Sequence, residues 1–249
     1  MAKSVHLRVL APELGQSLLS VHDFLGYWVR ATDGIVGQVD GIFFDDQHWT
    51  VRYLVVRTGK WWSKARELIS PCSVRGIDSE NHGLWLNLTR EQIKNSPDVD
   101  SDQPVSRQKE LEFQRYYRWP YFWTGAGIWG VAPTAEGLVG DPYAWADVSQ
   151  DAVLGPRVDG QDPHLRSVKE VLRYRIEATD AYFGRVNDVL VDLEDWSLPY
   201  LVIDTGTWIP GKTVLVSPRW VEAIETSDRR LRLSLSRAEI QSSHFYRKD

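Results

Sequence analysis

The chain has almost no cysteine. Cys72 is the only one among 249 residues, so no disulfide can form within the chain. Such scarcity is typical of proteins from a reducing compartment. In the internal repeat described below, Arg219 stands at the position that corresponds to Cys72. We therefore interpret the thiol as structural or incidental, and not as a catalytic nucleophile.

Long apolar runs are also missing. No stretch reaches the ~20 apolar residues of a membrane-spanning helix, and residues 1–16 lack the apolar core of a secretory signal. We expect a soluble, cytoplasmic protein without a transmembrane segment. An excess of basic charge is absent too, because 29 Lys and Arg face 34 Asp and Glu, for a net charge of −5. Without a basic stripe to neutralise phosphates, strong nucleic-acid binding is not expected.

What the sequence does contain is a stretch that occurs twice. Residues 18–99 align with residues 165–246 at a constant offset of 147 and without a gap. Roughly a third of the aligned positions are identical, far more than chance gives. Ala-Thr-Asp, Tyr-Leu-Val and Ser-Pro all recur in frame. The repeat predicts four segments, which are an N-terminal arm (1–17), repeat 1 (18–99), a linker (100–164) and repeat 2 (165–246).

Strand signals dominate each copy. The Tyr-Leu-Val segments at 53–55 and 200–202 are continuous apolar runs, typical of buried strands. Gly41 interrupts the alternation of residues 35–45, which predicts a bulge. Each copy ends with a helix start in capping-box spacing, Thr89 with Gln92 and Ser236 with Glu239. The pattern predicts an all-β fold of two small barrels or curled sheets, each closed by a short helix.

The order of these elements resembles the PRC-barrel family. The resemblance rests on Gly37-Gln38-Val39 and Gly184-Arg185-Val186, on the Tyr-Leu-Val strand, and on the Ser-Pro motif, all present in both copies. That family includes the cytoplasmic domain of the photosynthetic reaction centre H subunit and the C-terminal domain of a ribosome maturation factor. The H subunit's transmembrane helix and the ribosome factor's separate N-terminal domain have no counterpart here. The resemblance therefore implies a fold, two tandem PRC-type barrels, and carries over neither specific activity.

The linker has a character of its own. Residues 106–115 are polar and predict a short helix, and an aromatic segment follows at 116–130. Either these rings pack between the two barrels and hold them together, or they form an exposed docking patch for a partner protein. A membrane surface is the weaker variant, because Arg115 and Arg118 add little basic charge. The residues that we predict to contact a partner are Tyr117, Trp119, Tyr121, Trp123 and Trp129.

One segment matches the phosphate-binding pattern of nucleotide-binding loops. Gly206, Gly211, Lys212 and Thr213 occupy its fixed positions. A true loop of this kind opens into a helix, whose N-terminal amides hold the phosphates. Here residues 214–218 are β-branched and end in proline, and the equivalent segment 59–66 has neither the second glycine nor the Lys-Thr pair. We interpret the match as chance and the segment as a hairpin.

No other pattern points to chemistry. The six histidines lack metal-ligand spacing, so no metal and no cofactor are predicted. Recurring carboxylates (Asp33 and Asp180, Asp45 and Asp192) are interpreted as turn residues. Recurring tryptophans (Trp49 and Trp196, Trp61 and Trp208) are interpreted as core or hairpin residues. No Ser-His-Asp or Cys-His arrangement can be proposed.

The leading hypothesis is a non-enzymatic module for protein interaction or assembly, which binds an unidentified protein partner. Three alternatives stay open. The protein is a peripheral subunit of a photosynthetic or other membrane complex, an RNA-processing or ribosome-associated factor, or, least favoured, a nucleotide-binding protein that uses residues 206–213. The duplication also allows a pseudo-dimer within one chain, or a homo-oligomer.

Overall fold

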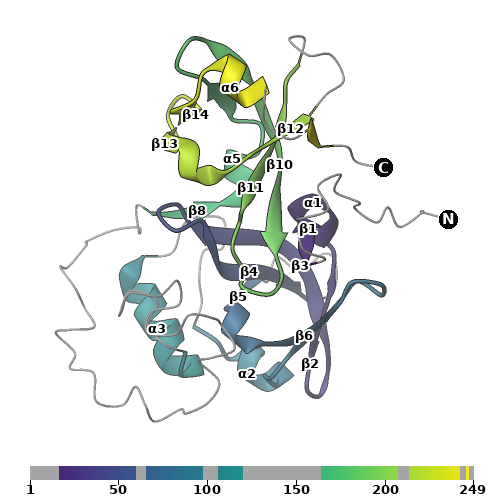
Figure 1. Cartoon of the computed structure of the whole chain (residues 1–249). Coiled ribbons are helices and arrows are strands. Elements are labelled where there is room, and N and C mark those ends of the chain that lie inside the picture. The colour runs from purple at the N-terminus through teal and green to yellow at the C-terminus, as the bar shows by residue number, and fades with distance from the viewer. Residues whose placement is uncertain are drawn as a thin grey trace. The chain divides into compact units, whose positions relative to one another are not determined.

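The computed structural model describes residues 17–59, 66–97, 106–119, 164–206, 213–241 and 245–246. The chain divides into two compact units. One, here called the N-unit, comprises Leu25–Ser167, and the other, the C-unit, comprises Met1–Phe24 with Val168–Asp249. The described part is dominated by strands in two sheets with few helices, so the all-β class is confirmed (Figure 1).

The N-unit is built on a sheet of seven described strands, in which β5, β4, β3, β2, β7 and β6 follow one another and β8 adds to β3. Its elements are β2 (Trp28–Ala31), β3 (Gly34–Asp45), β4 (Thr50–Thr58), β5 (Arg66–Ile69), the 3-10 turn η1 (Pro71–Ser73), β6 (Val74–Asp78), β7 (Gly83–Leu86), α2 (Arg90–Lys94), α3 (Arg107–Tyr117) and β8 (Leu165–Ser167).

The C-unit repeats this strand order. Its sheet of eight described strands runs β13, β14, β9, β10, β11, β12 and β15, and β1 adds to β10. Its elements are β1 (Leu18–Ser20), α1 (Val21–Phe24), α5 (Val168–Val171), β9 (Arg175–Glu177), β10 (Tyr182–Asp192), β11 (Tyr200–Asp204), β12 (Thr213–Val216), the 3-10 turn η3 (Pro218–Trp220), β13 (Val221–Glu225), β14 (Arg230–Leu233), α6 (Arg237–Gln241) and β15 (Phe245–Tyr246).

Both sheets are open paths of strands within the described residues. Each bends at a bulge in its long strand, between Val39 and Gly41 in β3 and between Val186 and Asp188 in β10. The bulge predicted at Gly41 is thereby confirmed. Gly37 and Gly184 recur because a Cβ at either position would lie 2.0 or 2.1 Å from a carbonyl oxygen of the neighbouring strand, Arg57 or Asp204.

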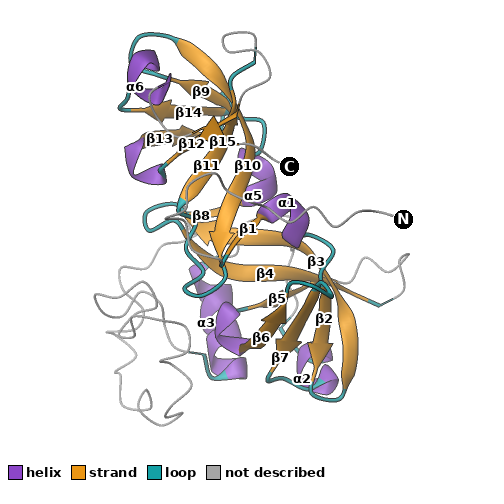
Figure 2. Cartoon of the chain, turned by 45° about the vertical axis from the view of Figure 1, so that its right-hand side comes forward, coloured by secondary structure: helices purple, strands orange, loops and turns teal. Residues whose placement is uncertain are grey.

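The first strand of each sequence repeat lies in the other repeat's sheet. β1 pairs with β10, with Leu18 opposite Asp192, and β8 pairs with β3, with Leu165 opposite Asp45. The two registers are equivalent under the offset of 147, so the exchange is reciprocal (Figure 2). The boundaries of the two compact units therefore differ from those of the two sequence repeats. The repeat boundaries stay a prediction about the duplication of the sequence.

Polar contacts anchor each exchanged strand. In the C-unit, the Ser20 hydroxyl donates to Asp188, whose carboxylate also accepts from the backbone amides of His22 (3.2 Å) and Val189 (2.8 Å). Burial raises the pKa of Asp188, and these hydrogen bonds only partly offset it. In the N-unit, Arg166 Nε lies 2.8 Å from Asp46 Oδ2.

The predicted capping signals are present. Thr89 and Gln92 form a full capping box at the start of α2, and Ser236 exchanges the same pair of contacts with Glu239 before α6. Asp33 and Asp180 accept hydrogen bonds from the first amides of those helices, at Arg90 (2.8 Å) and Arg237 (2.9 Å). These aspartates therefore also join a strand turn to a helix, a role beyond the turn-forming one that was predicted.

Candidate interaction surface

Two of the five aromatic residues predicted to contact a partner lie in the described part of the linker. Trp119 is 9% exposed, and its indole nitrogen donates to Ser73 Oγ at 2.7 Å. Tyr117 is half-buried and stacks on Trp119, with ring centroids 4.1 Å apart. Both rings thus pack within the N-unit. Tyr121, Trp123 and Trp129 lie outside the described residues, and their role as contact residues stays a prediction.

The helix predicted at 106–115 is present as α3, which ends at Tyr117, and Trp119 follows it. Ser106 caps its first turn by accepting from the Lys109 amide. Phe113, fully buried, meets Tyr53 of β4 with ring centroids 6.4 Å apart, and Figure 2 shows α3 alongside β4 and β5. The helix therefore covers one face of the N-unit sheet.

A buried polar cluster lies beneath α3. Glu110 is fully buried beside Tyr53 and Arg52. Burial, with the Glu110 carboxylate and its hydrogen bond, raises the pKa of the Tyr53 hydroxyl well above its usual value. Arg52 Nη2 lies 3.3 Å from Asp45 Oδ2. Burial opposes ionisation of Asp45, but Arg52 and the hydrogen bonds from His48 outweigh it and lower the pKa of Asp45. The cluster holds the helix; it does not form an open site.

The remaining candidate residues occupy structural positions. Asp45 and Asp192 accept from turn amides two or three residues ahead, as predicted for turn residues. Trp49 and Trp196 are buried at left-handed backbone positions, with φ of 51° and 63°. Thr213 opens strand β12 and not a helix, whereas Trp61, Trp208, Gly211 and Lys212 lie outside the described residues. Among the described residues, no three His, Cys, Asp or Glu side chains gather as a metal site.

A different group of residues forms an exposed apolar surface on the N-unit. Trp28 and Arg30 project from the outer face of β2, with Ile35 of β3 opposite Arg30 on one side and Trp85 of β7 on the other. Trp28 is 49% and Ile35 50% exposed. The Trp85 indole leans over Gly83, the neighbour of Trp28, within 3.1 Å of where a Cβ would stand. We call Trp28, Arg30, Ile35 and Trp85 the aromatic face.

The equivalent face of the C-unit is mostly charged, although Tyr182, 49% exposed, stands where the N-unit has Ile35. Arg175, Glu177 and Arg232 stand where the N-unit has Trp28, Arg30 and Trp85. There Arg230 pairs with Glu177 (3.1 Å), Glu225 (2.7 Å) and Asp228 (3.0 Å), and Arg232 with Glu225 (3.4 Å). Such a lattice of exposed ion pairs suits a solvated sheet surface. The same strand arrangement therefore forms without tryptophans at these two positions, and the aromatic face is not a requirement of the fold.

Comparison with known protein families gives a match that covers most of the first sequence repeat. Residues 17–93 match the family model described as the PRC-barrel domain. These residues are a PRC-barrel domain. The first elements of the matched segment, β1 and α1, belong to the C-unit, and its residues 25–93 belong to the N-unit. A search of curated proteins finds none that matches the chain. Within the part of the chain that the structure describes, no helix has the length and apolar character needed to cross a membrane.

The aromatic face was missed by reading the sequence. Trp85 is at least 50 residues from Trp28 and Ile35 in the chain, and an isolated surface hydrophobic residue needs no explanation. The available signal was the repeat itself, because the tryptophans align with arginines under the offset of 147. A position that must be apolar for the core would stay apolar in both copies, as Val29 and Ile176 do.

Proposed function

We propose that this protein is a non-enzymatic interaction module whose PRC-barrel docks a partner protein on the aromatic face. The observation that supports it is a contrast between the two units. The N-unit holds Trp28 and Trp85 on its surface, whereas the C-unit holds Arg175 and Arg232 at the equivalent positions, beside a lattice of ion pairs. Tryptophan and arginine dominate the energetics of protein interfaces, and leaving such a patch in water is unfavourable.

The charge around the aromatic face specifies the partner further. Arg30 lies between Ile35 and Trp85, and the Arg90 side chain passes beside Gly34, which precedes Ile35. An apolar centre with guanidinium groups at and beside it complements a partner surface with an apolar anchor and acidic side chains around it. We propose that Tyr121, Trp123 and Trp129 add contacts to the same partner.

The test replaces the two tryptophans of the aromatic face with the residues at the equivalent positions of the C-unit. In Trp28→Arg/Trp85→Arg, both new residues are those that the C-unit holds at the equivalent positions, so folding should be preserved and checked by melting temperature. Trp220→Arg is the control, since Trp220 is 44% exposed on the other unit. Proteins cross-linked in lysate of the source cell are then compared by quantitative mass spectrometry.

The proposal predicts acidic-surfaced proteins that are recovered with the wild type and with Trp220→Arg but depleted at least tenfold with Trp28→Arg/Trp85→Arg. Recovery of the same proteins at the same level with all three would overturn it. Concentration-dependent self-association that disappears only in the double variant would identify the partner as a second copy of this chain.

A further inference from the structure

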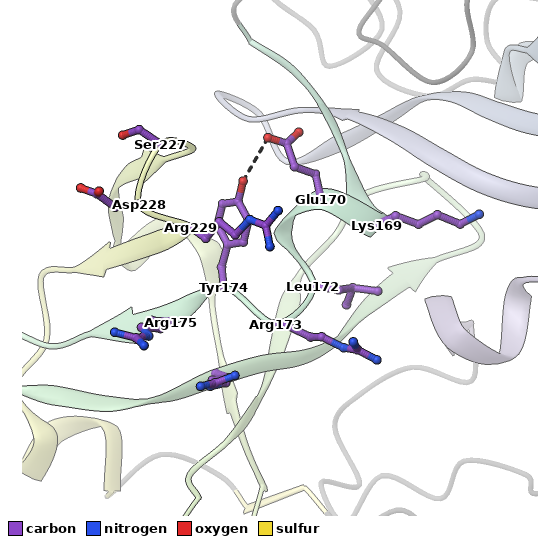
Figure 3. Close-up of a pocket in the computed structure, with 10 residues that line it drawn as sticks. Lys169, Glu170, Leu172, Arg173, Tyr174, Arg175, Ser227, Asp228 and Arg229 are labelled. Atoms are coloured by element: carbon purple, nitrogen blue, oxygen red, sulfur yellow. Dashed lines mark hydrogen bonds between the residues drawn. The ribbon is translucent and has the colours of Figure 1, made fainter.

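A second surface has the composition of a binding site, and it belongs to the C-unit. A pocket of about 900 Å³ is lined by residues of α5, the turn after it, β9, β10 and the turn before β14 (Figure 3). This volume lies within the usual range for ligand sites. Five cations line it, namely Lys169, Arg173, Arg175, Arg185 and Arg229, against two acids, Glu170 and Asp228. We call it the basic pocket.

Both acids of the basic pocket are already engaged. Glu170 accepts from the Tyr174 hydroxyl at 3.0 Å, the contact drawn in Figure 3. Asp228 lies 3.0 Å from Arg230, a member of the ion-pair lattice. Within the described residues, Arg173, Arg175, Arg185 and Arg229 make no ion pair. Cations therefore outnumber carboxylates in the pocket by five to two, and none of these four arginines is neutralised by an ion pair among the described residues.

The arginines of the basic pocket occupy positions that are unfavourable for the stability of the fold. Arg175 and Arg185 stand directly opposite each other on β9 and β10, and like charges in that relation destabilise a sheet. Arg173 and Arg229 have left-handed backbones, with φ of 70° and 49°, a conformation that is unfavourable for residues with a Cβ. At the position of Arg173 the N-unit uses Gly26, also at positive φ.

The N-unit shows that the architecture does not require these cations. The same backbone hydrogen bonds recur there, from Gly26 N to Val39 O and from Trp28 N to His82 O, as from Arg173 N to Val186 O and from Arg175 N to Arg229 O. At the five cationic positions the N-unit has His22, Gly26, Trp28, Gln38 and His82. The positive charge is therefore particular to the C-unit, in a chain whose net charge is −5.

We propose that the basic pocket binds a ligand with two adjacent phosphate groups. Planar guanidinium groups bind phosphate oxygens in a bidentate manner, and two linked phosphates carry several negative charges that the arginines lining one pocket can share. An acidic peptide spreads the same charge over several residues. Tyr174, the aromatic residue of the pocket, is buried, so recognition falls on the phosphates.

The test is isothermal titration calorimetry of the full chain with inorganic pyrophosphate at constant ionic strength. The variant Arg175→Gln/Arg185→Gln should lower the affinity at least tenfold. Arg219→Gln, which removes the same kind of charge from an exposed position outside the pocket, should change it less than twofold. Without ligand, the double variant should melt at or above the wild-type temperature, because the opposed pair of charges is gone.

Failure to detect pyrophosphate binding at millimolar concentration would overturn the proposal. So would an equal loss of affinity in Arg219→Gln, or tighter binding of a tetraglutamate peptide than of pyrophosphate. ADP serves as a second probe. Equal affinity for ADP and pyrophosphate would support recognition of the phosphates alone, and tighter binding of ADP would support a nucleoside diphosphate as the source of the same group.

Discussion

At the scale of single residues, the described ionisable groups with shifted pKa values serve mostly to hold elements in place. Asp188 is the clearest case. Gly41 stands at the equivalent position of the N-unit, so the carboxylate is an addition of the C-unit. It is 7% exposed and joins β1, α1 and β10 through one hydroxyl and two amides. These hydrogen bonds hold the exchanged strand β1 in the C-unit sheet. Burial raises the pKa of the Asp188 carboxyl group.

The raised pKa gives a signed prediction for Asp188→Asn. The folded state holds the Asp188 proton more tightly than the unfolded chain does, so the contribution of this group to stability is full below the unfolded pKa of about 4 and falls as the pH rises through the folded pKa. The amide of asparagine can accept from one backbone amide and donate to Ser20. We expect Asp188→Asn to gain stability relative to the wild type as the pH rises from about 4 to 7.

Asp188→Ala is the matched control, because it leaves the Ser20 hydroxyl and both amides without their acceptor. It should lose about 2–3 kcal/mol of unfolding free energy at neutral pH. Urea denaturation of the three proteins at several pH values measures both effects. A stability difference between wild type and Asp188→Asn that does not change with pH would contradict the assignment.

Cys72 gives a second prediction at this scale. Burial is the main reason that the pKa of its thiol rises to about 11, so at pH 8 only about one thiol in a thousand is ionised. We expect native Cys72 to react with a disulfide reagent at least 100-fold more slowly than the same thiol in guanidinium-unfolded protein. Equal rates in the two states would show that the thiol is open to solvent.

At the scale of elements, α3 shows how a linker segment becomes part of a core. The helix is polar in sequence, with a net preference for solvent, yet it docks through Leu111, Phe113 and the buried Glu110. The chain reverses its direction at Arg118, which has a left-handed backbone (φ 59°). This turn places Trp119 beside Ser73, to which its indole nitrogen donates a hydrogen bond. The helix is therefore held by both apolar and polar contacts.

Replacing Glu110 should release this helix. Glu110→Ala removes a buried charge that interacts with Tyr53 and Arg52, and loss of one partner from such a cluster is expected to lower the unfolding free energy by roughly 3 kcal/mol. Trp119 fluorescence, isolated by comparison with Trp119→Phe in the same background, should shift to the red as the ring meets water. Glu112→Ala, on the half-buried side of α3, is the control and should change little.

At the scale of the whole molecule, the reciprocal strand exchange makes each sheet dependent on both halves of the sequence. β3 receives β8 from beyond the linker, and β10 receives β1 from the start of the described chain. Neither sequence repeat contains all the strands of its own sheet. Cutting the chain between the repeats therefore removes one strand from each sheet and leaves the edge at Phe43–Asp45 of β3 uncovered.

We expect an isolated fragment of residues 18–99 to dimerise. Leu18 aligns with Leu165, so β1 of one fragment can pair with β3 of another in the register that β8 uses, as in domain swapping. A fragment of residues 26–99, which lacks β1 and α1, should not form this dimer. Sedimentation equilibrium of both fragments over a range of concentrations measures the difference. A folded, monomeric 18–99 fragment would contradict the expectation.

The sequence by itself determined the local structure and its duplication. The bulge at Gly41, the capping box at Thr89 and Gln92, and the buried Tyr-Leu-Val strand were predictable because each depends on a few neighbouring residues. The destination of β1 and β8 was not, because either sheet could accept the same strand in the same register. Nor were the aromatic face and the basic pocket, each of which joins one segment of the chain to a residue more than 40 positions away, Trp85 or Arg229. Only the tertiary structure brings Trp28 beside Trp85 and Arg175 beside Arg229, since strand pairing between distant segments sets those neighbours.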